Sequence, residues 1–249
     1  MQRRSWVVMV LVLALLAACS SIESGEVPTE SLEPWVRVVS TSERTEVAVA
    51  LLGPGFGQNY VTLVEGDVMT VRVGDEAPVS LAVTSPGTTN ARYRAELGPV
   101  APGTELTIAL QRNRYADAPA TRVVVPPAPT GVAVVGGPVF ALDEDVIVTW
   151  DPFDDDRVAL RLAVTECLDA TPDQFEFVRG LSDALLDKDF VGSVGTGGIG
   201  FPPVAFECDA DVLVGRYTTV VDLDPAFGGV DGRSRTIRFG PEIAVSFRE

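Results

Sequence analysis

The chain has 249 residues with 35 acidic and 19 basic side chains and no histidine, which gives a formal net charge of −16. A surface this acidic repels nucleic acid and anionic lipid headgroups, so neither is an expected partner, and no cationic patch is evident in the sequence. Without histidine there is no Ser-His-Asp or Cys-His catalytic arrangement and no common zinc site. The composition therefore favours a non-catalytic protein that needs no cofactor.

The N-terminus has the parts of an export signal. Arg3 and Arg4 form a short positive region, and an apolar run from Trp6 to Leu16 follows it. This run is too short for a transmembrane helix, which needs about 20 apolar residues, but it fits the hydrophobic region of a signal peptide. We predict that residues 1–18 are a signal peptide.

The apolar run ends in Leu16-Ala17-Ala18-Cys19, which resembles the lipobox of bacterial lipoproteins. The resemblance implies cleavage before Cys19, lipid on its thiol, a fatty acyl chain such as palmitate on its amine, and attachment to a membrane. Ser20, rather than aspartate, follows Cys19, which resembles outer-membrane sorting where the host has two membranes. The alternative is an ordinary secretory signal with a chance cysteine. Cleavage would remove two arginines and no acids, taking the formal charge from −16 to −18.

Cys167 and Cys208 are the other two cysteines. Because exported chains meet an oxidising compartment, we predict a disulfide between them. A closed loop of about forty residues corresponds to ~4 kcal/mol of stabilisation in the chain-entropy model. Two free thiols serving a redox or metal function are the alternative, but CxxC spacing and a histidine partner are both absent.

Residues 19–34 are polar and acidic without periodicity, which predicts a flexible tether. From Trp35 onward apolar residues alternate with polar ones, and turn signals such as Gly53-Pro54-Gly55 separate the runs. Short alternating runs with breakers every ~8–12 residues are typical of an all-β sandwich. We predict one sandwich over residues 35–125.

Residues 126–130 contain three prolines in four positions, which predicts a stiff linker. Alternation resumes at Val132 and continues to Phe247, so we predict a second sandwich over residues 131–249.

Residues 168–206 interrupt the β pattern of the second sandwich. Thr171-Pro172-Asp173-Gln174 is typical of a helix start. The apolar residues that follow recur at helical spacing, at Phe175, Val178, Leu181 and Leu185. We predict a small helical insertion here, followed by a mobile loop from Gly192 to Gly200.

Two motifs resemble fibronectin type III and related immunoglobulin-like modules. Val148-Thr149-Trp150-Asp151-Pro152 resembles the family's second strand with its buried tryptophan. The stretch from Leu97 to Leu106 resembles the family's L-x-P-G-T-x-Y corner, with Leu106 in place of the tyrosine. The resemblance implies an all-β chain of two tandem sandwiches of this kind.

Two further motifs carry candidate chemistry. Asp151, Asp154 and Asp156 lie around the turn after Trp150 and are the candidate calcium ligands, because calcium takes six to eight oxygens. EF-hand spacing is absent, and solvated turns are the favoured alternative. Residues 195–200 match G-x-G-x-x-G by letter, but Phe201-Pro202-Pro203 follows where a dinucleotide site needs a helix, so a loop is favoured.

The leading hypothesis is a lipid-anchored protein of the cell envelope that acts in adhesion, scaffolding or ligand binding, with a protein or glycan as its ligand. It rests on domain type, which is a fold-level analogy. The alternative is a carboxylate-dependent hydrolase of glycans, which needs two acids ~5–10 Å apart. The sequence singles out no such pair and no catalytic residue.

Overall fold

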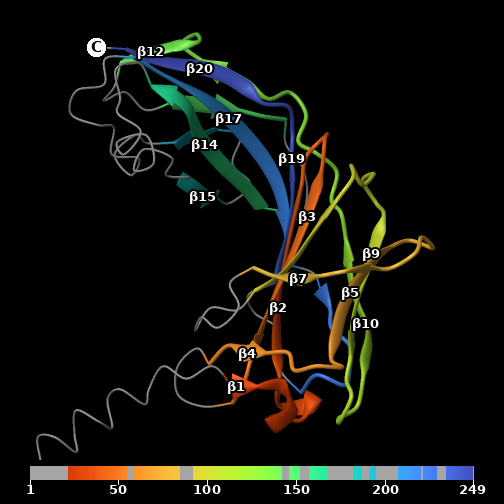
Figure 1. Cartoon of the computed structure of the whole chain (residues 1–249). Helices are drawn as coiled ribbons and strands as arrows, with labels where there is room; N and C mark the ends of the chain where they lie inside the picture. Colours follow the sequence, from red (N-terminus) through yellow and green to blue (C-terminus); the bar gives the residue numbers. More distant parts are fainter. Residues whose placement is uncertain are drawn as a thin grey trace, which may run out of the picture.

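The computed structural model describes residues 22–54, 59–84, 92–141, 146–151, 157–167, 182–186, 191–194, 207–219, 221–228 and 234–248. In these ranges the chain forms strands and two short 3-10 turns, and it contains no α-helix. The strands form two β-sandwiches, one at each end of the molecule in Figure 1. The prediction of an all-β chain with tandem sandwiches is confirmed.

Two sheets face each other in the first sandwich. One follows the order β2 (Glu33–Ser40), β3 (Thr45–Leu52), β8 (Tyr93–Leu97) and β7 (Ala82–Val83). The other follows the order β10 (Ala118–Val124), β9 (Glu105–Gln111), β5 (Val68–Val73) and β6 (Val79–Ser80). This division of the strands between sheets is that of fibronectin type III and immunoglobulin-like sandwiches, in which strands A, B and E face strands C, F and G.

Alternation along each strand builds the core of the first sandwich. Val36 and Val38 of β2, Val47 and Leu51 of β3, and Leu106 of β9 are all at most 1% exposed. Leu106, at the position of the family's corner tyrosine, is a fully buried core residue.

The second sandwich repeats the same plan. One sheet follows the order β11 (Ala133–Val135), β13 (Val146–Thr149) and β16 (Val191–Val194). The other contains β15 (Ser182–Leu186), β14 (Arg157–Cys167), β17 (Glu207–Thr218) and β20 (Ile243–Arg248), with β12 (Val139–Ala141) at its edge. Trp150 packs in this core with 4% of its surface exposed, so the prediction of a buried tryptophan is confirmed.

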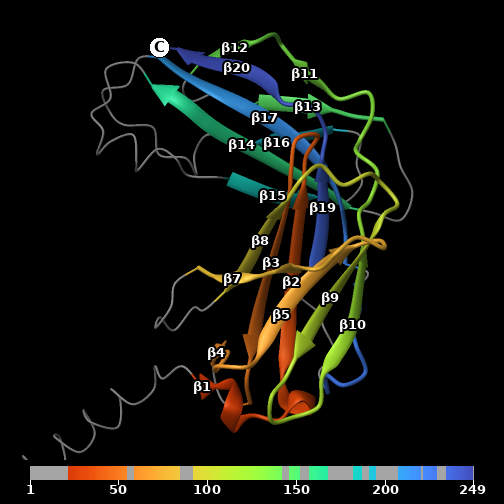
Figure 2. The ribbon, with the colours of Figure 1, turned by 45° about the vertical axis from the view of Figure 1, so that its right-hand side comes forward.

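An arm of the second sandwich reaches across to the first. β17 pairs with β20 over one half of its length and with β19 (Arg235–Phe239) over the other. β19 in turn lies parallel to β2, as Figures 1 and 2 show, and β18 (Val221–Asp222) pairs with β10. Residues 221–228 and 234–239, which we call the clasp, therefore add a strand to each sheet of the first sandwich.

The clasp also fills the core of the first sandwich. Phe227 belongs to its buried cluster, and the carboxylate of Asp224 accepts a 2.7 Å hydrogen bond from the amide of Ala120. Residues 126–130 connect β10 to β11, but the predicted limits of 35–125 and 131–249 do not describe the packing, because the clasp lies beyond residue 131 in sequence and packs on the first sandwich.

The prediction of a flexible tether over residues 19–34 is wrong for residues 22–34. β1 (Ile22–Glu23) pairs with β4 (Val61–Thr62), two 3-10 turns follow at Ser24–Glu26 and Thr29–Ser31, and β2 begins at Glu33. Val27 and Leu32 are buried in the first core. The segment is held because its few apolar residues and its backbone carbonyls find partners far along the chain.

The main partner is Arg112, whose side chain is 0% exposed. Its Nε pairs with Oδ2 of Asp67 at 2.9 Å, and its Nη1 donates to Oγ1 of Thr29 at 3.2 Å. Its Nη2 donates to the carbonyl oxygens of Ser24 and Val27. This Arg112 network satisfies backbone groups that an acidic sequence without periodicity gives no reason to expect ordered.

The predicted helical insertion is contradicted at residues 182–186, which form strand β15 and place Leu185 in a ladder with β14. Gly192, predicted to begin a mobile loop, lies in strand β16. A short apolar run does not distinguish a strand from a helix by its period, and the paired strand β14 decides the outcome here. Residues 168–181, 187–190 and 195–206 of the predicted insertion lie outside the described residues, as do the signal peptide 1–18 and Cys19.

Candidate functional site: an arginine groove

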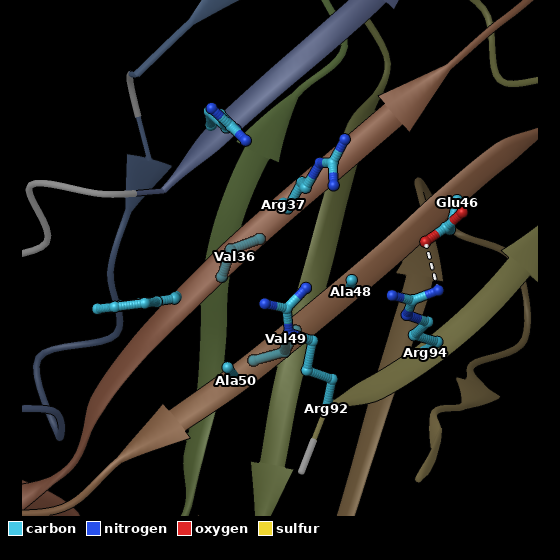
Figure 3. Close-up of a pocket in the computed structure, with 10 residues that line it drawn as sticks. Val36, Arg37, Glu46, Ala48, Val49, Ala50, Arg92 and Arg94 are labelled. Atoms are coloured by element: carbon cyan, nitrogen blue, oxygen red, sulfur yellow. Dashed lines mark ion pairs between the residues drawn. The ribbon is translucent and has the colours of Figure 1, made fainter. Parts of the chain in front are cut away.

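A groove of about 290 Å³ lies on the outer face of the first sandwich. It is lined on that face by the alternate residues of β2 and β3 that do not enter the core, by Arg92 and Arg94 at β8, and by Arg235 of β19. Figure 3 shows these side chains above the sheet. We call this site the arginine groove.

Strand register puts three of the arginines in one row. Arg235 is the partner of Arg37, Arg37 is the partner of Ala48, and Ala48 is the partner of Arg94. Since neighbouring strands lie about 4.8 Å apart, the Cα atoms of Arg37 and Arg94 are about 10 Å apart, on the two strands that flank β3. Arg92 precedes Arg94 by two residues and so faces the same side of the sheet.

One acid, Glu46, lines the groove beside its four arginines, Arg37, Arg92, Arg94 and Arg235. Its Oε1 lies 3.5 Å from Nη1 of Arg94, and the two side chains are 43% and 41% exposed. An ion pair this exposed contributes at most about 1 kcal/mol. Within the described part of the chain, the guanidinium groups of Arg92 and Arg235 make no hydrogen bond or ion pair.

The clustering of arginine runs against the charge of the chain, in which acids outnumber cations by 35 to 19. Like charges directly opposite each other on neighbouring strands are destabilising, and Arg37 and Arg235 are in that arrangement. Features that oppose folding persist where function needs them.

The floor of the groove is apolar. Ala48 and Ala50 of β3 are 8% and 6% exposed, and their methyl groups leave room between the arginines. Trp35 lines the same groove and packs against Ala50, Leu52 and Tyr60. Its Nε1 donates a 3.1 Å hydrogen bond to Glu33, which holds the indole in one orientation.

Two core-side residues position the arginines. Tyr93 lies between Arg92 and Arg94 in sequence and points inward, where its hydroxyl accepts a 2.7 Å hydrogen bond from the amide of Leu63. Burial is the main cause that raises the pKa of Tyr93 above its usual 10.0, so the phenol stays protonated at neutral pH.

Arg238 holds β19, and with it Arg235, against the first sandwich. Its Nη1 donates to Oγ of Ser40 and to the carbonyl oxygen of Val100, both at 2.6 Å. Burial lowers the pKa of Arg238, but an arginine remains charged at physiological pH.

The chemistry of the arginine groove is that of anion binding. Guanidinium groups hold carboxylates and phosphates through paired, charge-assisted hydrogen bonds. A carboxylate-dependent hydrolase would need two acids converging on a substrate, and Glu46 is the one acid among the described residues that line this groove.

The sequence-predicted sites lie elsewhere. Cys167 and Cys208 are directly opposite each other on β14 and β17, and Cys208 is 1% exposed. Opposite residues on antiparallel strands have Cα atoms about 4.5–5.5 Å apart, within the range of a disulfide, so this register is compatible with the disulfide, which stays a prediction.

Of the calcium candidates, Asp154 and Asp156 lie outside the described residues. Asp151 is exposed, and its carboxylate lies over Gly131, where an added Cβ would collide with it. The described residues hold no group of three or more potential metal-ligating side chains, and none of their helices is long and apolar enough to cross a membrane.

Sequence reasoning missed the arginine groove and predicted no cationic patch. The signal was present in part, because Arg37 occupies an outward position in the alternation of β2, and Arg92 and Arg94 are two residues apart. Arg235 carried no such signal, since only the three-dimensional structure brings it beside Arg37.

No family model and no curated protein sequence matches the chain. Solved structures that match include two crystal forms of a cytokine receptor complex and the FN1–FN3 domains of chicken CNTN1. The first receptor form is 15% identical over 85% of this chain and 99% of that one, with a TM-score of 0.28. The second is 16% identical over 86% and 95%, also with a TM-score of 0.28.

The CNTN1 domains are 13% identical over 86% of this chain and 64% of theirs, with a TM-score of 0.29. At these TM-scores the likenesses carry no argument about function. The assignment of the fold rests on the strand order within each sandwich.

Proposed function

We propose that this chain is a lipid-anchored, non-catalytic binding protein of the bacterial cell envelope that recognises an anionic ligand in the arginine groove. The observation that carries the proposal is the presence of four arginines and one acid around a single groove, on a chain whose net charge is −16. The arginines outnumber the acid at this groove, although acids outnumber cations over the whole chain.

The contrast between the groove and the acidic body also favours selectivity. Most of the surface repels polyanions, so an anionic ligand is attracted only where the arginines outnumber the acids locally. Exposed charges are screened beyond about 8 Å at physiological ionic strength, so the affinity should fall as salt rises.

The ordered segment after Cys19 supports a close attachment. Strand β1 begins at Ile22, only three residues beyond the proposed lipidated cysteine. Three extended residues span about 10 Å at most. A lipid on Cys19 would therefore hold the β1 end of the first sandwich near the membrane surface, with the outer membrane as the expected location in a host with two membranes.

Binding is tested with the full-length protein purified from membranes in detergent. The probes are polyphosphate, polygalacturonate and polyglutamate, measured by calorimetry at low salt. We expect at least one to bind, and the double variant Arg37→Ala/Arg94→Ala to bind it at least 10-fold more weakly. The proposal fails if none of the three binds, or if the double variant binds as the parent does.

Arg72→Ala/Arg122→Ala is the matched control. These two exposed arginines also flank one central strand, since both are partners of Thr107 on the outer face of the other sheet. This variant removes the same charge from the same sandwich and should keep at least half of the parent affinity.

The anchor is tested by Cys19→Ala. We expect this variant to leave the membrane fraction and to lose incorporation of labelled palmitate. Unchanged membrane retention would contradict the lipid anchor, and it would leave the arginine groove unaffected.

A further inference from the structure

The arginines stand in two sets on either side of the β3 floor. Arg37 and Arg235 lie on one side, while Arg92 and Arg94 lie on the other. The Cα atoms of Arg37 and Arg94 are about 10 Å apart across β3, and the arginine side chains extend from the strands over the groove. A ligand with two anionic groups and an uncharged part between them can contact both sets of arginines at once.

The uncharged part would lie over Ala48, Ala50 and Trp35. These residues offer methyl groups and an indole whose own donor is already used on Glu33. A flat ring with an apolar face fits such a floor better than a strongly hydrated chain does, because the methyl groups and the indole offer dispersion contacts, and the guanidinium group of Arg92 reaches over the same part of β3. The ring of a sugar has such a face, and its hydroxyl groups can accept hydrogen bonds from guanidinium N–H groups at the rim.

The position of the groove on a sheet face argues against an extended peptide. Each strand beneath it is paired on both sides, with β19 between β17 and β2, β2 between β19 and β3, β3 between β2 and β8, and β8 between β3 and β7. Extended peptides gain much of their affinity from main-chain hydrogen bonds to a free strand edge, and this face has no free edge to offer.

Duplex nucleic acid fits poorly for a different reason. Its backbone carries one charge per about 1.7 Å, so most of its phosphates would lie outside the groove and against an acidic surface. A polymer with more widely spaced anionic groups avoids that repulsion.

We infer that the ligand of the arginine groove is an acidic polysaccharide, with a sugar ring over the Ala48–Ala50 floor and Trp35 and with oxyanion groups on the two arginine sets. This inference rests on the proposed function and names the class of its ligand.

The test compares four polymers of matched length by calorimetry on the full-length protein. Polygalacturonate carries carboxylates, dextran sulfate carries sulfates, dextran is neutral, and polyglutamate is an acidic peptide. We expect at least one acidic polysaccharide to bind at least 10-fold more tightly than polyglutamate, and dextran not to bind. The preferred polysaccharide then identifies carboxylate or sulfate as the anionic group.

The floor is tested with Trp35→Ala and Trp35→Phe. The alanine variant should lose about 10-fold in affinity for the polysaccharide but change the affinity for polyglutamate less than 2-fold, whereas phenylalanine should keep most of the binding. Ala48→Glu, which puts a carboxylate on the floor without removing an aromatic side chain, should abolish binding even if Trp35→Ala fails to fold.

The results distinguish an acidic polysaccharide as the ligand from anion binding in general. Polyglutamate binding as tightly as either polysaccharide, or a Trp35→Ala variant that folds and affects both ligands equally, overturns the polysaccharide while leaving an anion-binding groove in place. Absence of binding by any polyanion overturns the proposed function as well.

Discussion

Two groups of arginine lie on the first sandwich in opposite surroundings. Arg112 is buried with a carboxylate, a hydroxyl and two carbonyl oxygens around its guanidinium group. The arginines of the groove are partly or fully exposed and lie near one another, and Arg94 pairs with Glu46, the acid that lines the groove. A guanidinium group surrounded by the chain's own acceptors holds the fold together, whereas a cluster of partly exposed guanidinium groups around one acid can also bind an anionic ligand.

The largest expected effect comes from breaking the Arg112 network. Arg112→Ala leaves Asp67 buried without its cation and should lower the free energy of unfolding by about 3–5 kcal/mol. Urea unfolding followed by circular dichroism measures it. Arg114→Ala is the control, because Arg114 is exposed and donates one hydrogen bond to the carbonyl of Gly25. Equal losses in both variants would contradict a structural role specific to Arg112.

A second expected effect concerns the contact between the clasp and the segment that Arg112 holds. A Cβ at Gly228 would collide with the carbonyl oxygen of Glu30, which is backbone and cannot rotate away. Gly228→Ala should therefore destabilise the protein by about 1–3 kcal/mol, as overpacking does. Thermal unfolding followed by circular dichroism measures this loss. Gly98→Ala is the control, because an added Cβ there meets no atom within 4 Å. If Gly228→Ala is as stable as the parent, the contact between the clasp and Glu30 is not tightly packed.

Tyr93 connects the arginine groove with the segment that Arg112 holds. It lies between Arg92 and Arg94 in sequence, and its hydroxyl accepts a hydrogen bond from the amide of Leu63, which follows β4, the partner of β1. Tyr93→Phe leaves the partly buried amide of Leu63 without its acceptor and should lower the free energy of unfolding by about 1–2 kcal/mol. Arginine-groove binding should persist, which calorimetry with the preferred polymer measures.

Tyr93 also gives the stability a dependence on pH. Its folded pKa lies above the unfolded value of 10.0, so the folded state keeps the phenol proton longer. The corresponding stability is fully present below pH 10 and is lost as pH rises through the folded pKa. Tyr93→Phe should therefore lose less stability between pH 9 and about pH 11 than the parent does. A parallel decline would contradict the assignment to Tyr93.

The smallest expected effect on folding belongs to the groove itself. Arg37→Ala/Arg94→Ala should change the free energy of unfolding by no more than about 1 kcal/mol, because the ion pair of Arg94 with Glu46 is exposed and because one of the two facing arginines, Arg37 and Arg235, is removed. The same variant is expected to lose at least 10-fold in binding. A large loss of stability would show that Arg37 and Arg94 are structural residues like Arg112, and it would contradict the distinction between the two groups of arginine.

The sequence predicted what depends on local period. Alternation along β2, β3, β9 and β17 was visible, and so was the buried position of Trp150, because a strand with one face in a core repeats every two residues. The groove could have been suspected from Arg37, Arg92 and Arg94, all at outward positions.

What failed depends on partners remote in sequence. Ser24 and Arg112 are 88 residues apart, so the composition of residues 19–34 indicated a flexible tether, while contacts with remote residues order residues 22–34. The position of Arg235 in the groove and the strand conformation at Leu185 were missed for the same reason, since a pairing partner decides where each lies. The local pattern of the sequence predicts the strands of this chain, and pairing between strands remote in sequence determines which residues line the groove.

The clasp has a consequence for how the chain assembles. The amide of Val36 donates to Oγ of Ser234, 198 residues later, and Phe227 completes the core around it. Domains generally fold in order from the N-terminus as a chain emerges, but here the first sandwich lacks one strand of each sheet and part of its core until residues 221–239 are present. The two sandwiches therefore finish folding together, and a chain that ends before residue 221 leaves its N-terminal half with open strand edges, which are sites for aggregation or for capture by a chaperone.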